Sequence, residues 1–321
     1  MKLGKATALL LVIALILTGC FLQKQDQSKT DTVGILTRDL MHDTVELVRT
    51  NALQDGLTAA GYTVQLLDAK ADQSIQTQQL QTLLEQGCKG VIIDPVMVTA
   101  APELVGLAKE KDVPLIFTGS QSPEEALRLW DKVCFVGADG EQPGLQQGNI
   151  LAGTPDQGDI NGDGLLSYIL IRDEGNFTDT QLHIAGVLTA LTDAEVALTE
   201  LKLCDAGGDR EKAKQICAVL LAEYGKDIEA VICTNDAMAL GAQEAIADGG
   251  RTVNEDVYLV GLGGAEEAIS AIAEGKLTGT VREDTQALTQ QVCNLLNQLQ
   301  TGAAEKQVYY VNCIAVSATV K

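Results

Sequence analysis

Short apolar segments alternate with amphipathic segments along most of the chain, and this alternation limits the possible folds more than any other feature. In the first half, apolar runs rich in leucine and β-branched residues predict strands at 33–37, 64–67, 90–94 and 114–118. The amphipathic stretches between them predict helices at about 44–60, 74–86 and 102–111. Strands that are apolar at nearly every position are typical of parallel sheets covered by helices on both faces.

The second half of the chain repeats this scheme. Expected strands cover 168–172, 196–203, 230–234, 257–261 and 278–282, and expected helices cover 180–191, 211–224, 238–247, 265–274 and 285–300. Two such series predict an α/β protein with two Rossmann-like, doubly wound parallel-sheet lobes joined by a hinge. Ligands of these sheets bind beyond the carboxyl ends of the strands, so a ligand site is expected in the cleft between the lobes.

The first twenty residues have the pattern of a secretory signal. Two lysines precede an apolar run over 8–17, which is too short to span a bilayer. The following Leu-Thr-Gly-Cys20 resembles a bacterial lipobox, in which the cysteine becomes the lipidated first residue of the mature chain. Residues 21–31 are polar and predict a flexible tether. We therefore expect an exported protein, at the cell surface or in the periplasm, that is anchored to the membrane by Cys20; a short buried helix is the alternative interpretation.

Composition and missing motifs exclude several classes of function. A formal net charge of −21 disfavours binding to nucleic acid phosphates. The sequence has no Gly-x-Ser-x-Gly elbow, no His-Glu-x-x-His motif and no helix-turn-helix segment before its first strand, so neither an enzyme nor a repressor is expected. Apart from Cys20, the cysteines are scattered without a Cys-x-x-Cys pair, and most are expected to be small buried hydrophobic residues.

Residues 159–167 have the spacing of a calcium-binding loop. Oxygen-bearing side chains stand at the first, third, fifth and ninth positions, and glycine stands at the sixth, where such a loop turns sharply. The twelfth position, a bidentate glutamate in an EF-hand, is Leu170, so another carboxylate would have to come from elsewhere. An ordinary Asp/Asn/Gly turn is the alternative. The candidate Ca²⁺ ligands in the loop are Asp159, Asn161, Asp163, the carbonyl of Leu165, and Ser167.

A resemblance to a known family extends over nearly the whole chain after the tether. The calcium-type loop that runs into a strand and the segment Thr-Asn-Asp-Ala-Met-Ala-Leu-Gly-Ala at 234–242 resemble the bacterial galactose/glucose-binding proteins, which are type I periplasmic sugar-binding proteins. Residues 113–117, 135–139 and 279–281 resemble the same family. The resemblance implies two lobes with three hinge crossings, a sugar cleft, and one Ca²⁺ in the C-terminal lobe. It also implies that Glu229 supplies the missing bidentate carboxylate.

The sugar-contacting positions of the family carry over only in part. The family's two stacking aromatic residues fall at Thr44 and Gly208, and one of its aspartates falls at Gly263; only Asp179 and Asn235 keep the family's residue type. Both of these could instead be helix N-caps. Because both stacking rings and most hydrogen-bonding partners are lost, we expect a ligand that is not bound in the usual galactose/glucose manner. Two imidazoles at pocket positions would suit an acidic or hydroxyl-rich solute. The candidate ligand-binding residues are His42, Asp43, Phe177, Asp179, His183, Asn235 and Glu283.

The expected protein is a monomeric substrate-binding lipoprotein that closes on a small polar solute, a sugar or sugar derivative. Its partner is expected to be an ABC transporter permease or a chemosensory protein. The alternative is a sensor or structural lipoprotein on the same scaffold that has lost hexose binding. The expected organisation is a signal peptide (1–19), a lipidated cysteine and tether (20–31), an N-lobe (32–137 and 284–311), and a C-lobe with the calcium loop (138–283 and 312–321).

Overall fold

The computed structural model describes residues 31–121, 124–173 and 177–318, without the side chains of residues 177 and 178. The chain divides into two units, 1–31 and 32–321. The expected signal segment and Cys20 belong to the first unit and lie outside the described residues, as does most of the tether. Within the described part, no helix has both the length and the apolar character needed to cross a bilayer.

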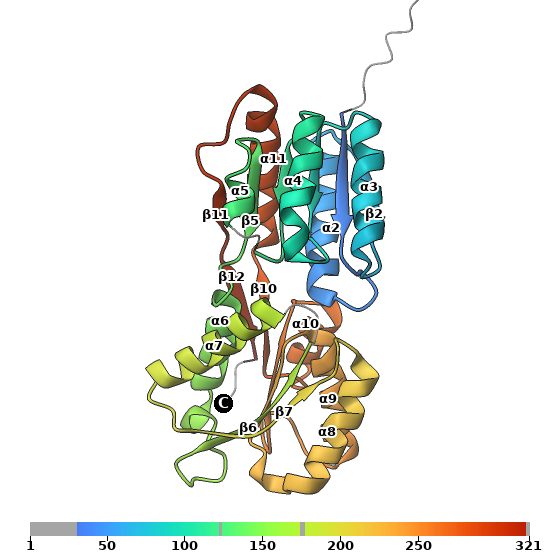
Figure 1. The fold of residues 1–321 in the computed structure, drawn as a ribbon. Coiled ribbons are helices and arrows are strands. Elements are labelled where there is room, and N and C mark those ends of the chain that lie inside the picture. The colour runs from blue at the N-terminus through green and yellow to red at the C-terminus, as the bar shows by residue number, and fades with distance from the viewer. Residues whose placement is uncertain (1–30, 122–123, 174–176, 319–321) are drawn as a thin grey trace, which may run out of the picture. The chain divides into compact units, whose positions relative to one another are not determined.

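The first lobe of the second unit is built on a six-stranded parallel sheet with the order β11-β5-β4-β3-β1-β2. Helices α3 and α4 pack on one face, and α2 and α11 pack on the other, each over its own apolar core (Figure 1). The strands are β1 (Thr32–Thr37), β2 (Thr63–Asp68), β3 (Gly90–Ile93), β4 (Leu115–Phe117), β5 (Val133–Gly137) and β11 (Val308–Tyr310). The helices are α2 (Thr44–Ala59), α3 (Gln73–Glu85), α4 (Ala101–Glu110), α5 (Glu124–Leu127) and α11 (Thr285–Thr301).

The second lobe repeats the arrangement with the sheet order β12-β10-β9-β8-β6-β7, in which only the edge strand β12 is antiparallel. Its two faces again carry separate apolar cores. The strands are β6 (Leu166–Arg172), β7 (Leu198–Asp205), β8 (Ala230–Cys233), β9 (Tyr258–Leu262), β10 (Gly279–Glu283) and β12 (Cys313–Ser317). The helices are α6 (Gln142–Ala152), α7 (Phe177–Asp193), α8 (Arg210–Tyr224), α9 (Asp236–Asp248) and α10 (Glu266–Ala273).

The described chain passes between the two sheets three times. It leaves the first sheet after β5, returns to it after β10, and leaves it again after β11 to form β12. Strands β10 and β12 pair with each other and lie next to the first lobe in Figure 1. The predicted α/β class with two doubly wound lobes is confirmed.

The local sequence explains where several helices begin. Five of them start after an aspartate or asparagine whose side chain accepts a hydrogen bond from a backbone N–H of the first turn, which satisfies a donor that has no partner inside the helix. These capping residues are Asp43, Asp72, Asp209, Asn235 and Asp284. Two of these caps, Asp43 and Asn235, also line the cavity described below.

The sequence prediction omits several elements. Strand β5 is a continuous apolar run and carries the same signal as the predicted strands, so its omission has no physical reason. Strands β11 and β12 are short and partly exposed, which leaves little apolar pattern to detect. Strand β7 begins and ends two residues later than predicted, because it lies at the sheet edge and is only half-buried.

The described cysteines agree with the expectation of small buried groups. None forms a disulfide, and five of the seven are buried. Burial raises the pKa of Cys134, Cys217 and Cys313 to about 12, so these thiols are protonated and unreactive at neutral pH.

Helix α6, which the sequence prediction also omits, packs closely against α7 through glycines. A Cβ atom at Gly144 would lie 1.9 Å from the carbonyl oxygen of His183, and one at Gly148 would lie 2.6 Å from the carbonyl oxygen of Val187. From the other side, a Cβ at Gly186 would lie 2.2 Å from the carbonyl oxygen of Glu141. The same glycines that weaken the helical signal of α6 therefore fix the position of α7.

Changing Gly144 to alanine is expected to destabilise the protein by about 1–3 kcal/mol, because the added methyl group meets backbone rather than a flexible side chain. The control is Gly106→Ala on the exposed face of α4, where a Cβ meets nothing within 4 Å. That change should stabilise the helix by up to about 1 kcal/mol. Urea unfolding of both variants measures the difference, and equal free energies of unfolding would contradict the packing argument.

Candidate functional site

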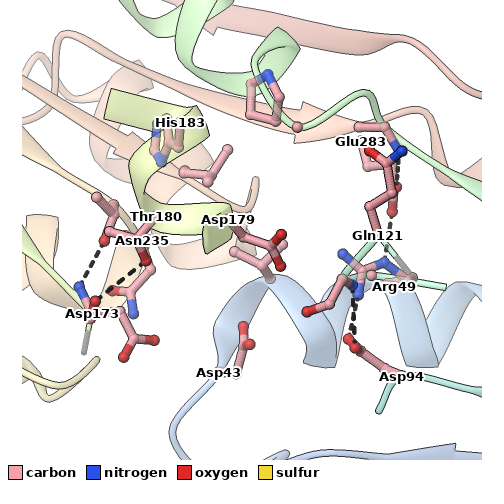
Figure 2. Close-up of a pocket in the computed structure, with 18 of the residues that line it drawn as sticks. Asp43, Arg49, Asp94, Gln121, Asp173, Asp179, Thr180, His183, Asn235 and Glu283 are labelled. Carbon is pink, nitrogen blue, oxygen red and sulfur yellow. Dashed lines mark hydrogen bonds and ion pairs between the residues drawn. The ribbon is translucent and has the colours of Figure 1, made fainter. Parts of the chain in front are cut away.

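A cavity of about 160 Å³ lies between the lobes at the carboxyl ends of their strands. The first lobe contributes the start of α2, Asp94 after β3, and the turn after β4. The second lobe contributes Asp173 after β6, the first turns of α7, and Asn235 after β8. Figure 2 shows these side chains converging on one space from both lobes. The cavity lies where the parallel sheets were expected to place a ligand site.

Two glycines of the second lobe allow the first lobe to approach closely. A Cβ atom at Gly208 would lie 2.7 Å from the carbonyl oxygen of His42, and one at Gly263 would lie 3.4 Å from a methyl group of Val45. Both glycines have positive φ, of 76° and 133°. These are the positions where the family resemblance placed a stacking ring and an aspartate. The backbone of the first lobe therefore occupies the space that a side chain at position 208 would need, and Val45 lies in van der Waals contact with position 263.

Arg49 connects the first lobe to the hinge. Its Nη1 donates to Asp94 Oδ2 at 3.1 Å, and its Nε donates to Glu283 Oε2 at 2.7 Å. The other oxygen of Glu283 accepts from the backbone N–H of Ala138, in the first crossing, at 3.1 Å. Burial opposes the charge of Arg49, but Glu283 and Asp94 outweigh it and raise the pKa of the guanidinium. Glu283, predicted as a ligand-binding residue, is therefore held by the protein's own arginine.

A second arginine forms an ion pair with the carboxylate at the start of α2. Arg38 forms an ion pair with Asp43 and donates to the hydroxyl of Ser120 at 3.4 Å. The other carboxylate oxygen of Asp43 accepts from the backbone N–H of Glu46 at 2.9 Å, which caps α2. Asp43 lines the cavity, as predicted, but it also has these two structural roles.

His183 lines the cavity as an uncharged hydrogen-bond donor. It is buried, and burial lowers its pKa to about 4. The amide nitrogen of Gln147 donates to the carbonyl oxygens of Cys233 and Gly261, both at 2.9 Å, which leaves its amide oxygen as an acceptor. That oxygen lies 2.9 Å from His183 Nε2, so the proton of the neutral imidazole is on Nε2.

Asp179 and Asn235 face the cavity from the starts of α7 and α9 (Figure 2). Asp179 accepts a hydrogen bond from Ser120; burial raises its pKa, and the nearby Asp94 adds to the effect. The amide oxygen of Asn235 caps α9 by accepting from Met238 N at 2.8 Å. Its Nδ2 is buried and has no hydrogen-bond partner in the described part of the protein. Asn235 thus caps α9 through its amide oxygen, and its amide nitrogen remains available as a hydrogen-bond donor.

His42, a predicted ligand-binding residue, is not among the described residues that line the cavity. His42 is largely exposed, and its Nδ1 pairs with Asp39 Oδ2 at 2.9 Å. The hydrogen bond and charge of Asp39 raise the pKa of His42. Phe177 begins α7, but its side chain lies outside the described residues. The sequence analysis also missed Arg38, Arg49 and Asp94; only Asp94 had a detectable signal, because it directly follows a buried strand.

The predicted calcium-type loop converges on Glu229. Carboxylate oxygens of Asp159, Asp163 and Glu229 lie within 4.8 Å of one another. Glu229 is buried at the start of β8, and its two oxygens accept from the backbone N–H groups of Asn161 and Ser167, each at 2.9 Å. Hard oxygen donors of this kind are the ligands that Ca²⁺ prefers. The residues present therefore fit a calcium ion, with Glu229 arriving from a distant strand.

Comparison with known proteins identifies the family. Residues 46–304 match the periplasmic binding protein domain, so the chain belongs to this family, and its relatives are substrate-binding proteins rather than enzymes. The D-galactose/methyl-galactoside binding periplasmic protein MglB of Haemophilus influenzae is 30% identical over 84% of this chain and 82% of its own. The ribose import binding protein RbsB of Bacillus subtilis is 27% identical over 94% of this chain and 92% of its own. The predicted family resemblance is confirmed.

Solved structures share the fold. The Caulobacter myo-inositol binding protein bound to myo-inositol superposes with a TM-score of 0.74 at 22% identity, over 91% of this chain and 94% of its own. A periplasmic solute binding protein of an ABC transporter from Actinobacillus succinogenes, with bound D-allose, gives 0.76 at 16% identity, over 89% and 97%. These superpositions establish the shared two-lobed fold. At identities this low they do not identify the solute, which has to be inferred from the cavity.

Replacing Arg49 with methionine is expected to destabilise the protein by about 3–5 kcal/mol, because it leaves Asp94 and Glu283 buried without a counter-charge. The matched control is Arg128→Met, which breaks an exposed pair with Glu124 and should change stability by less than about 0.5 kcal/mol. Thermal and urea unfolding would measure both changes. A loss at Arg49 no larger than that at Arg128 would show that the buried pairs contribute little.

Proposed function

We propose that this protein is an exported solute-binding protein whose lobes close on one small sugar or sugar derivative and present it to an ABC transporter. The observation that carries the proposal is the orphan donor of Asn235, a buried amide that faces a cavity lined by both lobes. A buried donor without a partner costs about 1–3 kcal/mol, which a solute oxygen would offset. Relatives whose names specify galactose and ribose support a sugar-like solute.

Closure of the lobes provides the mechanism. A solute held by Asp43 from the first lobe and by Asp179 and Asn235 from the second binds the closed arrangement better than the open one, because only the closed arrangement offers both sets of contacts. The three chain crossings between the sheets form the hinge. The transporter would then recognise the closed protein through surfaces that both lobes contribute.

The function is tested by thermal unfolding of the purified protein with galactose, glucose, ribose and myo-inositol. A solute at a hundred times its Kd should stabilise the protein by about 2.7 kcal/mol. Galactose and glucose are expected to bind more weakly than micromolar, because no phenylalanine, tyrosine or tryptophan ring is among the described cavity residues. Asn235→Ser keeps a capping hydroxyl and removes the amide, so it should lower affinity about tenfold with little change in the ligand-free protein. If no sugar, polyol or derivative of either stabilises the protein, the proposal fails.

We also propose that the loop at 159–167 binds one Ca²⁺ through Asp159, Asn161, Asp163, Leu165, Ser167 and Glu229. The clustered carboxylates support this, since without a cation they repel one another at close range. The ion would neutralise the cluster and hold the loop to the start of β8.

A chelator is therefore expected to lower the melting temperature of the protein at low ambient calcium. Glu229→Gln should remove this dependence, because it deletes the carboxylate that joins the loop to β8. Glu223→Gln on the exposed side of α8 makes the same change elsewhere and should leave the response to chelator intact. If neither the chelator nor added calcium changes the melting temperature, the proposed calcium site is ruled out.

The last part of the proposed function is a lipid anchor at Cys20, supported by the signal and lipobox pattern of the sequence. In cells, Cys20→Ala is expected to release the protein from membranes or to leave it with its signal uncleaved. Fractionation followed by mass determination of the N-terminus distinguishes these products. A processed Cys20→Ala protein that stays in the membrane fraction would require another anchor.

A further inference from the structure

The cavity carries a large excess of negative charge. Its described lining includes six carboxylates and two guanidiniums, which leaves a formal charge of −4 with His183 neutral. The carboxylates are Asp43, Asp94, Asp139, Asp173, Asp179 and Glu283. Neutral hydroxyl groups can donate hydrogen bonds to carboxylates, but they do not cancel charge in a confined, partly dry space.

The two arginines are not available to an acidic solute. Arg49 is shared between Asp94 and Glu283, and Arg38 is paired with Asp43. An anion in the cavity would compete with these internal carboxylates for both guanidiniums. It would also lie close to the remaining carboxylates of the lining, and like charges at this range repel strongly.

The histidines do not supply positive charge to the cavity either. His183 is buried and uncharged, and its Nε2 proton is directed to Gln147. His42 lies outside the cavity lining beside Asp39. The acidic solute that two facing imidazoles would have suited therefore has no cationic partner among the described lining that is not already paired.

Polar atoms surround the position where the family's stacking ring is replaced by Gly208. A Cβ atom built there would have three near neighbours: the carbonyl oxygen of His42 at 2.7 Å, Asn235 Nδ2 at 3.3 Å, and Asp173 Oδ2 at 3.5 Å. Figure 2 shows Asp173 and Asn235 together on the same side of the cavity. Of these groups, Asp173 and Asn235 line the cavity, so this wall offers a carboxylate as an acceptor and an amide as a donor in place of an apolar face.

We propose that the solute is a hydroxylated ring that carries a protonated amine, such as an amino sugar, with the amine near Asp173 and a ring oxygen near Asn235. This proposal rests on the proposed function, because it takes the cavity as the solute site. A protonated amine donates to carboxylate and carbonyl oxygens and offsets the negative charge of the lining. A hydroxyl or ether oxygen accepts from the orphan amide, so one solute satisfies both features.

The test is calorimetry of the purified protein with solutes matched in shape. The panel pairs D-glucosamine with D-glucose and D-galactosamine with D-galactose, and adds N-acetylglucosamine and glucuronate, all at slightly acidic pH and constant salt. The amines are expected to bind at least about tenfold more tightly than their neutral and acidic counterparts. A neutral or acidic member that binds as tightly as the amines overturns the charge inference and leaves the proposed function standing. A panel without any binder overturns the amine inference, and the proposed function is then decided by the thermal unfolding with ribose, myo-inositol and other polyols.

Two variants locate the contact. Asp173→Asn should weaken binding of the amine by about tenfold and weaken binding of the matched neutral sugar clearly less, because only the amine loses an opposite charge. Asp55→Asn removes the same charge from the exposed side of α2, outside the cavity lining, and should change neither affinity. Equal losses for amine and neutral sugar in the Asp173 variant would show a structural effect and contradict the assignment.

Discussion

The pairing of Arg49 with Asp94 and Glu283 is the interaction on which the rest of the cleft depends. Arg49 comes from α2 of the first lobe, Asp94 follows β3 of the same lobe, and Glu283 ends β10 where the chain crosses between the sheets. All three side chains are at least nine-tenths buried, so the carboxylates would be strongly destabilised without the guanidinium. The contact therefore fixes α2, whose first turn carries Asp43, relative to the hinge. It also gives Glu283, which lines the cavity, a partner inside the protein.

The cleft differs from a hexose site chiefly through what its glycines allow. At Gly208 and Gly263, side chains of the family pattern are absent, and the first lobe approaches at contact distance. A ring at Gly208 would collide with the carbonyl of His42, so this closed arrangement and a stacking aromatic at that position are incompatible. The change is thus more than a loss of contacts, because the backbone of one lobe has replaced a side chain of the other. The calcium-type loop, which belongs to the second lobe alone, keeps oxygen-bearing side chains at its first, third, fifth and ninth positions.

The sequence was sufficient for the architecture because buried parallel strands are apolar at almost every position and helices alternate with them. It also located Glu229, Asp179 and Asn235, whose types survive at recognisable places. It did not locate Arg38 and Arg49, which stand in a loop and within a helix and acquire their role from carboxylates distant in the chain. His42, which its position suggested as a ligand contact, pairs with Asp39 three residues earlier and is not among the described residues of the cavity lining. Side-chain direction in a loop depends on such partners and leaves no periodic signal.

Charge connects the chemistry of the cavity to closure. In an open arrangement of the lobes, water would screen the carboxylates of the first lobe from Asp173 and Asp179 of the second; closure would bring them around one small space and remove part of that water. Closure of the empty protein is therefore opposed by electrostatic repulsion between the carboxylates. With a cationic, hydroxylated solute in the cavity, the electrostatic contribution to the free energy of closure becomes favourable. A ligand drives a conformational change only by as much as it prefers one state. An acidic cavity with its arginines internally neutralised thus makes closure itself selective, because only a solute that supplies positive charge recovers the energy that the closed state loses without it.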